Sequence, residues 1–366
     1  MPPVANQRLR SGFTTGACAA ASAKAACLLL VGSNREVETV EIPFPQGQRH
    51  TFTVTKAIRH SNADGQASVI KDAGDDPDVT NGAEITVRVV LTQAPGPEPL
   101  SLRFVAGEGV GTATKPGLAV AVGEAAINPV PRQMIAAAIA EALAGREDAG
   151  PLAVTVTVSI TNGSELAQKT LNHRLGIVGG LSILGTTGIV RPVSAEAWTA
   201  TIEASMAVAR ETGCREVVLS TGRTSEKGVQ AVLNLPEEAY AMMGDYLHFS
   251  LTAAARHGFA AIHLAGMWAK VLKAAMAIPQ THVRHGALEV EAAAEFIGTL
   301  SGEDALASSL AQANTAREIY DRLLAAHRAD LISQVCAAAK GYAEAVAQRP
   351  VTVYLIDSAM QVVARA

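Results

Sequence analysis

The second half of the chain twice repeats one order of elements: a helical pattern, a glycine, a short apolar run and a glycine-containing loop. The first copy predicts a helix at 195–212 and a strand at 216–220. The second predicts a helical pattern from about 236 to 258 and a strand at 259–264. Helices and strands that alternate in this way form a parallel sheet with helices on its faces. We therefore expect an α/β unit whose ligand lies in the loops at the carboxyl ends of its strands.

The first half mixes helices and strands without such a repeat. Helical patterns and strand-like alternation occupy these segments: helices at 17–31 and 130–143, and strands at 37–42, 51–57, 67–71, 84–91 and 154–160. A chain of 366 residues exceeds the roughly 250 to 300 residues at which a single hydrophobic core stops growing. We therefore predict two domains, at 1–172 and 173–366.

The composition limits the partners of this chain. Hydrophobic residues make up 49% and charged residues 17% of it, which is typical of a packed globular protein. A formal net charge of −4 provides no broad basic surface for duplex nucleic acid, and 4% aromatic residues provide no base-stacking platform. No apolar run approaches the roughly 18 residues of a membrane span. We expect a cytoplasmic protein with no nucleic-acid and no membrane partner, and the sequence leaves a homo-oligomer open.

Residues that commonly bind metals do not form a recognisable site. The four cysteines show no C-x-x-C motif and no close Cys/His pair, and small buried thiols in a reducing cytosol are expected: Cys18, Cys27, Cys214 and Cys336. His282 and His285 have an H-x-x-H spacing, but the local sequence offers no third ligand. No protein-bound metal is predicted.

The segment at 175–190, LGIVGGLSILGTTGIV, is an apolar run broken by five glycines. Glycine inside a regular element costs about 0.5 to 1 kcal/mol relative to alanine, and close approach of the backbone to a ligand would explain that cost. Tight turns without a ligand explain it equally well, and spacing alone leaves both interpretations open. On the first interpretation, the cofactor-binding residues are Gly179, Gly180, Gly185, Thr186, Thr187 and Gly188.

An acidic loop at 72–82, DAGDDPDVTNG, packs four aspartates into seven residues after a predicted strand. A calcium loop is excluded, because Gly74 takes the third position and Pro77 replaces the glycine required at the sixth. A solvated loop of Asx-turns is one interpretation. The other is a catalytic carboxylate, for which Asp75 and Asp76 are the candidates.

Several cations lie in loops that end or begin predicted elements. Lys115, Arg132 and Arg223 lie in the Pro/Gly loops TKPG, NPVPR and TGRTSE. The arginine fork matches carboxylates bidentately, so an acidic ligand is favoured, although any single cation of this kind is more often a surface residue. Lys270 and Lys273 lie one turn apart near a predicted helix start, where they contact an anion or face solvent.

These segments resemble the CbiD family, the cobalt-precorrin-5B C1-methyltransferases of cobalamin biosynthesis. The matching stretches follow one another in order over most of the first 190 residues: LRSGFTTG at 9–16, VIKDAGDDPDVT at 69–80, TKPGL at 114–118, AINPVPR at 126–132, KTLNHRLG at 169–176, and the loop at 179–190. Their length and order make the resemblance more specific than any single motif.

The resemblance implies an α+β N-terminal domain and a Rossmann-like C-terminal domain. It implies S-adenosylmethionine as methyl donor and a tetrapyrrole as acceptor, with cobalt present only as part of the substrate. The loop at 179–188 would then bind the donor or the ring face, and Thr221 and Gly222 would bind the donor. Asp75 or Asp76 would orient the donor or take a proton. Four cations would bind the substrate carboxylates: Lys115, Arg132, Arg174 and Arg223.

Two rival functions remain at this point. A non-catalytic tetrapyrrole carrier or scaffold would bind the ring without turnover. A nucleotide-dependent enzyme would use the Gly/Thr loop for phosphate, and ATP rather than the methyl donor would then stabilise it against heat.

Overall fold

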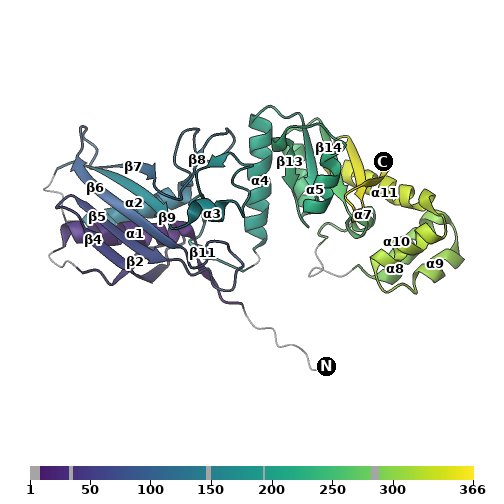
Figure 1. Ribbon diagram of the computed structural model, residues 1–366, viewed down its shortest axis with the longest axis horizontal. Coiled ribbons are helices and arrows are strands. Elements are labelled where there is room, and N and C mark those ends of the chain that lie inside the picture. Colours follow the sequence, from purple (N-terminus) through teal and green to yellow (C-terminus); the bar gives the residue numbers. More distant parts are fainter. Residues whose placement is uncertain (1–8, 33–35, 146–149, 193, 282–287) are drawn as a thin grey trace, which may run out of the picture. The chain divides into compact units, whose positions relative to one another are not determined.

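The computed structural model describes residues 9–32, 36–145, 150–192, 194–281 and 288–366, and it has a mixed α/β fold with several sheets (Figure 1). The chain divides into two compact units, Met1–Ser194 and Ala195–Ala366. This division falls after the boundary predicted at 172/173. The reason is strand pairing: two short strands late in the first unit, β10 (Ile177–Val178) and β11 (Ile189–Val190), pair with β8 (Thr112–Ala113) and β1 (Gly12–Phe13).

The first unit is built on a five-stranded sheet with the order β4-β5-β6-β9-β7. Neighbouring strands are antiparallel except β7 and β9, which are parallel. The bounds are β4 Lys56–Arg59, β5 Asp64–Ile70, β6 Glu84–Gln93, β9 Leu152–Ile160 and β7 Leu100–Ala106. A separate hairpin joins β2 (Thr39–Pro43) to β3 (Arg49–Thr53). The strand β7 was not predicted. It directly follows the segment PGPEP at 95–99, whose prolines and glycine are typical of a loop.

Two helices, α1 (Thr15–Val31) and α2 (Pro129–Leu143), pack against each other, and α1 also packs on β5 and β6. Helix α1 is buried along most of its length. Most of its buried side chains are alanines, which are small enough for neighbouring elements to pack close to the helix backbone. A Cβ atom at Gly65 of β5 would lie 2.7 Å from the carbonyl oxygen of Ala26. Small residues on both elements therefore set how closely the helix approaches the sheet.

One carboxylate, Glu141, joins α2 to α1 and β3. Its side chain lies 2.5 Å from Lys24 Nζ and 2.8 Å from an Arg49 guanidinium nitrogen. The hydrogen bond from Arg49, helped by that from Lys24, lowers the pKa of Glu141 to about 2. The native pKa lies below that of the unfolded chain, so this contribution to stability is present above the ordinary carboxyl range and is lost as the pH falls toward about 2.

We therefore expect Glu141→Gln to lower the melting temperature at neutral pH, with a difference from the parent that shrinks as the pH falls from 5 toward about 2. Thermal melts of both proteins across this pH range measure the effect. A difference that stays constant with pH would contradict the assignment.

The second unit contains a five-stranded sheet with the order β13-β12-β14-β15-β16. The first four strands are parallel and β16 is antiparallel to β15. The bounds are β12 Glu216–Ser220, β13 Tyr240–Met242, β14 Ala261–Gly266, β15 Val351–Ile356 and β16 Val362–Arg365. The chain places β13 on one side of β12 and β14 on the other, so the strand order reverses between β12 and β14.

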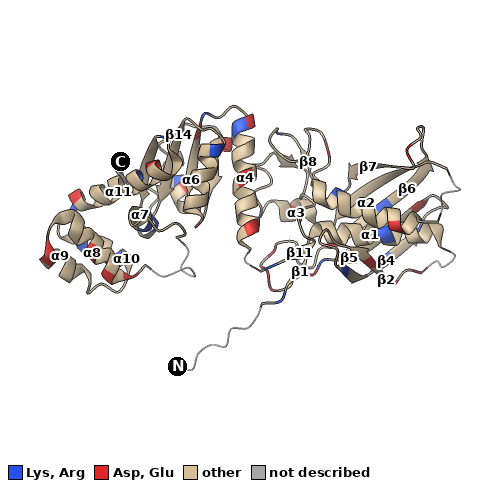
Figure 2. Ribbon diagram, turned by 180° about the vertical axis from the view of Figure 1, so that it is seen from behind, with Lys and Arg blue, Asp and Glu red and all other residues tan. Residues whose placement is uncertain are grey.

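The helices of the second unit connect these strands and extend beyond them. The bounds are α4 Ala195–Glu211, α5 Arg223–Gln230, α6 Leu247–Arg256, α7 Trp268–Ala275, α8 Val290–Ser301, α9 Asp304–Leu310, α10 Ala316–Ala325 and α11 Ala329–Ala347. Figure 2 shows acidic segments on α8 and α9, and both acidic and basic segments on α10. Among the described residues, no helix is both long and apolar enough to span a membrane.

The helical pattern predicted from 236 to 258 is wrong in its first part. A short 3₁₀ helix at Glu237–Ala239 leads into the strand β13, and the helix α6 begins only at Leu247. Three residues are too few to show the alternation of a strand, and β13 forms because it pairs with β12 in the sheet.

Candidate functional site

A cavity of about 360 Å³ lies at the carboxyl ends of β12, β14 and β15 in the second unit. We call it the switch-point cavity, because it lies where the strand order reverses between β12 and β14, the position at which open α/β sheets bind their ligands. Fourteen residues line it: Thr221, Gly222, Arg223, Thr224, Ser225, Met267, Trp268, Ala269, Lys270, Arg317, Tyr320, Leu355, Ile356 and Asp357. The loops after β12 and β14, predicted from the sequence as the ligand site, both contribute.

The polar side of the cavity is the turn from β12 into α5. Thr221 Oγ1 and Ser225 Oγ lie 3.2 Å apart, and Ser225 Oγ donates to the Gly222 carbonyl oxygen at 2.9 Å. A Cβ atom at Gly222 would meet no atom within 4 Å, so the backbone borders open space there. Arg223 begins α5 with an exposed side chain that forms no ion pair with any described residue. The turn therefore presents a helix N-terminus and a cation, which together suit a carboxylate.

Another part of the lining is aromatic. The Trp268 and Tyr320 rings lie 5.2 Å apart between centroids, and the Arg317 guanidinium lies 5.7 Å from the centre of the Tyr320 ring. Trp268 is only 5% exposed, and its indole N–H has no hydrogen-bond acceptor among the described residues. A buried donor without an acceptor is unfavourable and calls for an explanation, such as a ligand that supplies one. Burial raises the pKa of Tyr320, so its hydroxyl keeps its proton at neutral pH.

Two lysines of α7 take different environments. Lys270 lines the cavity, forms an ion pair with Asp245, and donates to the Thr281 carbonyl oxygen at 2.8 Å. Lys273 donates to the same oxygen at 2.9 Å and is buried. Burial, together with the nearby charge of Lys270, lowers the pKa of Lys273. The interpretation of both as a solvated helix face is therefore wrong for Lys273. The histidines at 282 and 285 lie outside the described residues.

The glycines of the loop at 179–188 lie in the first unit, and several press against the chain itself. A Cβ atom would lie 2.2 Å from the Gly109 carbonyl oxygen at Gly180, and 2.5 Å from the Thr14 side chain at Gly185. At Gly188 it would lie 2.5 Å from the Phe44 ring, while at Gly179 it would meet nothing within 4 Å. Tight packing of the chain on itself therefore accounts for most of these glycines. Their role in cofactor binding stays a prediction, as does that of Thr186 and Thr187.

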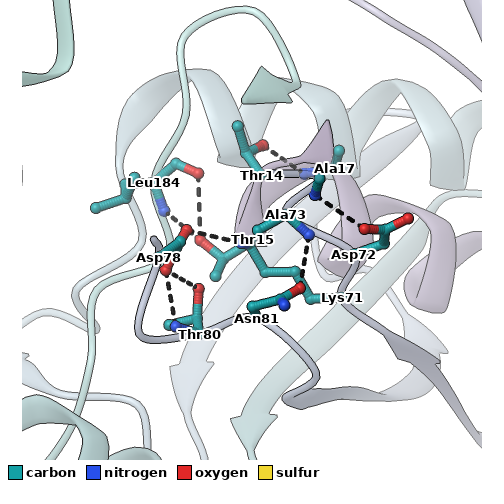
Figure 3. A network of polar contacts seen from close by, with 11 residues as sticks. Thr14, Thr15, Ala17, Lys71, Asp72, Ala73, Asp78, Thr80, Asn81 and Leu184 are labelled. Carbon is teal, nitrogen blue, oxygen red and sulfur yellow. Dashed lines mark hydrogen bonds and ion pairs between the residues drawn. The ribbon is translucent and has the colours of Figure 1, made fainter. Parts of the chain in front are cut away.

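The same packing brings the loop against the start of α1. Thr15 Oγ1 accepts from the Leu184 backbone N–H at 3.0 Å and lies 3.2 Å from the Leu184 carbonyl oxygen (Figure 3). Thr14 Oγ1 caps α1 by accepting from the Ala17 N–H at 3.1 Å. Two hydroxyls of the sequence GFTTG thus have structural partners, which is a local reason for threonine at both positions.

The acidic loop is organised by ion pairs and backbone donors (Figure 3). Asp78 lies 2.7 Å from the Nζ of Lys71, a lysine whose side chain is 1% exposed. It also accepts from the Thr80 N–H at 2.7 Å and from the Thr80 hydroxyl at 2.6 Å. Asp72 pairs with the Arg10 guanidinium at 2.5 Å, and this hydrogen bond lowers the pKa of Asp72 to about 2. These two aspartates therefore stabilise the loop.

The candidate catalytic carboxylates lie in the same loop. Asp75 accepts from the Arg10 backbone N–H at 2.6 Å. Asp76 donates its own N–H to the Ala73 carbonyl oxygen at 3.4 Å. The contacts hold the Asp75 carboxylate against the N-terminal segment of the described chain, and the catalytic role of Asp75 and Asp76 stays a prediction.

Three of the four predicted substrate cations lie in the first unit. Lys115 Nζ donates to the Arg174 carbonyl oxygen at 3.1 Å, so the structure brings these two residues together. Arg132 donates to the Ile127 carbonyl oxygen and pairs with Glu124, both at 2.8 Å. Arg223 lies in the second unit, in the switch-point cavity. Their role in binding substrate carboxylates stays a prediction.

Among the cavity residues that the sequence analysis did not assign to a site are Trp268, Arg317, Tyr320 and Asp357. Trp268 lies four residues after the end of the strand predicted at 259–264, close to the loop expected to bind a ligand, so its position carried a usable signal. The other three come from α10 and the end of β15, segments without a motif, and only the folded chain brings them to β12. Within the described ranges, no group of three or more His, Cys, Asp or Glu side chains is arranged to hold a metal ion.

Comparison with known proteins identifies the family. A family model described as CbiD matches residues 3–192, and one described as the CbiD C-terminal domain matches residues 280–366. A curated cobalt-precorrin-5B C(1)-methyltransferase from Desulfotalea psychrophila is 56% identical over 97% of both chains. Another from Geobacter sulfurreducens is 50% identical over 87% of this chain and 88% of its own.

One solved structure is also similar. The crystal structure of the cobalamin biosynthesis protein (cbiD) from Archaeoglobus fulgidus is 23% identical, covers 86% of this chain and 83% of that chain, and superposes with a TM-score of 0.37. The family assignment rests on the sequence matches, which include a family model over more than half of the residues. The chain belongs to the CbiD family.

Proposed function

We propose that this chain transfers a methyl group from S-adenosylmethionine to C1 of cobalt-precorrin-5B, giving cobalt-precorrin-6A in anaerobic cobalamin biosynthesis. The observation that carries the proposal is the 56% identity, over 97% of both chains, to a curated cobalt-precorrin-5B C(1)-methyltransferase. The tetrapyrrole substrate brings the cobalt. An enzyme of this kind would work in the cytoplasm, where both small molecules are found.

The second unit supports the proposal through its architecture. A parallel sheet with a reversal of strand order, bordered by helices, has the arrangement of a Rossmann-like domain, and we propose that description for it. Its cavity lies at the reversal and its size is within the range of small-molecule sites, roughly 300 to 1,000 Å³. Rossmann-like units commonly bind ligands with an adenosyl group at this position.

S-adenosylmethionine supplies a methyl group on positively charged sulfur, whose bond to carbon breaks as the bond to C1 forms. The protein then has to hold the two reactants in line, since correct positioning alone supplies roughly 7 to 11 kcal/mol in well-oriented intramolecular reactions. Apolar side chains such as Met267, Leu355 and Ile356 line the cavity, and we propose that they help to exclude water once both reactants are bound. The cations Lys115, Arg132 and Arg174 are proposed to bind substrate carboxylates, and Asp75 or Asp76 to take a proton.

The test is mass spectrometry of the corrinoid after incubation of the full chain with cobalt-precorrin-5B and methyl-labelled S-adenosylmethionine. The proposal predicts one labelled methyl group in the corrinoid, and its absence without enzyme. Corrinoid binding without label transfer would support a carrier instead. Thermal stabilisation by ATP, and none by the methyl donor, would support a nucleotide-dependent enzyme.

A further inference from the structure

We infer that the switch-point cavity is the methyl-donor site, and that Trp268, Tyr320, Arg223 and Asp357 recognise the donor. This inference rests on the proposed function, and it deepens it by assigning the donor to the second unit. The sequence divided the donor residues between the loop at 179–188 and the pair Thr221 and Gly222. Only that pair lies in the cavity.

Size decides between the two reactants. A corrin precursor with its acetate and propionate side chains is much larger than a cavity of about 360 Å³. An adenosyl amino acid is a drug-sized ligand, and pockets of this volume bury ligands of that size. The cavity therefore fits the donor, and the corrin ring would need a different surface.

The polar turn matches the amino-acid end of the donor. Helix α5 begins at Arg223, directly after Gly222, and both residues line the cavity. The Arg223 guanidinium and the N-terminus of the helix both attract a carboxylate. Arg223 was assigned to the substrate from the sequence. Because it shares one small cavity with Thr221 and Gly222, we assign it instead to the donor carboxylate.

The aromatic part of the lining matches the adenosyl end of the donor. The Trp268 and Tyr320 rings and the side chains of Leu355 and Ile356 form an aromatic and aliphatic surface for a purine. Asp357 accepts from the Gln361 N–H through Oδ1 at 2.8 Å, and a carboxylate has further capacity to accept from ribose hydroxyls.

Tryptophan fluorescence tests the position of the ligand directly, because the chain has only two tryptophans. Trp198 lies on α4 and does not line the cavity, so Trp198→Phe leaves Trp268 as the only tryptophan reporter. Titration with S-adenosylhomocysteine should change the emission of this variant saturably, with the dissociation constant that calorimetry gives for the parent. The matched variant Trp268→Phe, which keeps Trp198, should show no saturable change.

A second variant blocks the cavity without disturbing the fold. Gly222 lines the cavity in an extended conformation (φ 169°), and a Cβ atom there would meet no atom within 4 Å. Gly222→Leu should weaken S-adenosylhomocysteine binding, and raise the KM for the donor, by at least about tenfold. Gly341→Leu is the control, since Gly341 lies on the exposed face of α11 and is equally open. It should leave both constants unchanged.

Arg223→Ala completes the set, and should raise the KM for the donor more than the KM for the corrinoid. Label transfer together with an unchanged donor KM in Gly222→Leu, or an unresponsive Trp268 in a protein that binds S-adenosylhomocysteine, would overturn the donor site while the proposed function stands. No binding and no label transfer in the parent would overturn both. A response of Trp268 to ATP alone would also overturn the assignment.

Discussion

Replacement of Asp78 by alanine is expected to lower the free energy of unfolding of the first unit by about 3 kcal/mol. The reason is Lys71, which is almost completely buried and has Asp78 as an ion-pair partner at 2.7 Å. Without the carboxylate, a buried ammonium group loses its counter-charge. Breaking a buried pair in this way is costly even where the intact pair adds little stability. Both tryptophans lie in the second unit, so urea unfolding of the first should be followed by circular dichroism.

The double variant Lys71→Met/Asp78→Ala separates this cause from simple loss of contacts. Because it removes the buried charge as well, it should be more stable than Asp78→Ala by at least about 1 kcal/mol. Exposed pairs contribute about 0 to 1 kcal/mol, so Arg88→Met, which breaks the surface pair with Asp64, is a control in the same unit. If the double variant lost as much free energy of unfolding as Lys71→Met and Asp78→Ala lose together, the unpaired charge of Lys71 would not be the cause.

Acid should act on the same pair. Burial alone would raise the pKa of Asp78, but the Lys71 charge and the hydrogen bonds from Lys71 and Thr80 outweigh it and lower the pKa. The contribution of Asp78 is therefore present above the ordinary carboxyl pKa and is lost as the pH falls below it. The gap in stability between the parent and Asp78→Ala should narrow in acid.

Gly180→Ala is expected to destabilise the first unit by about 3 kcal/mol, the upper range for overpacking. The added methyl group would lie 2.2 Å from the Gly109 carbonyl oxygen, a backbone atom that no rotamer change can move. Gly109 is itself crowded: a Cβ atom there would lie 2.1 Å from the Ile160 carbonyl oxygen. The surrounding backbone therefore has little room to yield.

The adjacent Gly179→Ala is the matched control. At Gly179 an added Cβ meets nothing within 4 Å, but the backbone has φ +93°, so only conformational strain of about 1 to 2 kcal/mol is expected. Circular-dichroism melts of both variants measure the difference. Equal stabilities would show that the loop gives way at Gly180 and that packing does not explain its glycine.

Long periodic segments of this fold were predictable from the sequence. The helices at 195–212 and 130–143 and the strands at 216–220 and 84–91 agree with the structure to within two residues at each end. The strand β13 was not, because Tyr240–Met242 is too short to show a period and takes its conformation from its neighbour β12. The extent of the first unit depended on pairing between strands distant in sequence, which local patterns do not contain.

The candidate site likewise contains residues that the sequence could predict and residues that it could not. The loop Thr221–Arg223 was predictable, because a strand end in a parallel sheet is a general ligand position. Tyr320 and Asp357 were not, since they reach the cavity from segments about 100 and about 140 residues further along the chain than Thr221. The glycines at 180, 185 and 188 indicate from the sequence that other atoms pack close to the backbone there. Only the structure shows that these atoms belong to the chain itself and not to a ligand.

The most direct measurement of the proposed function is ¹³C NMR of the corrinoid formed from ¹³C-methyl S-adenosylmethionine and cobalt-precorrin-5B. Transfer to C1 predicts a single enriched methyl resonance, whose protons show a long-range correlation to the C1 carbon, formed only when the enzyme and the labelled donor are both present. An enriched methyl group at another ring position, or recovery of the unlabelled substrate by a protein that binds both reactants, would contradict it.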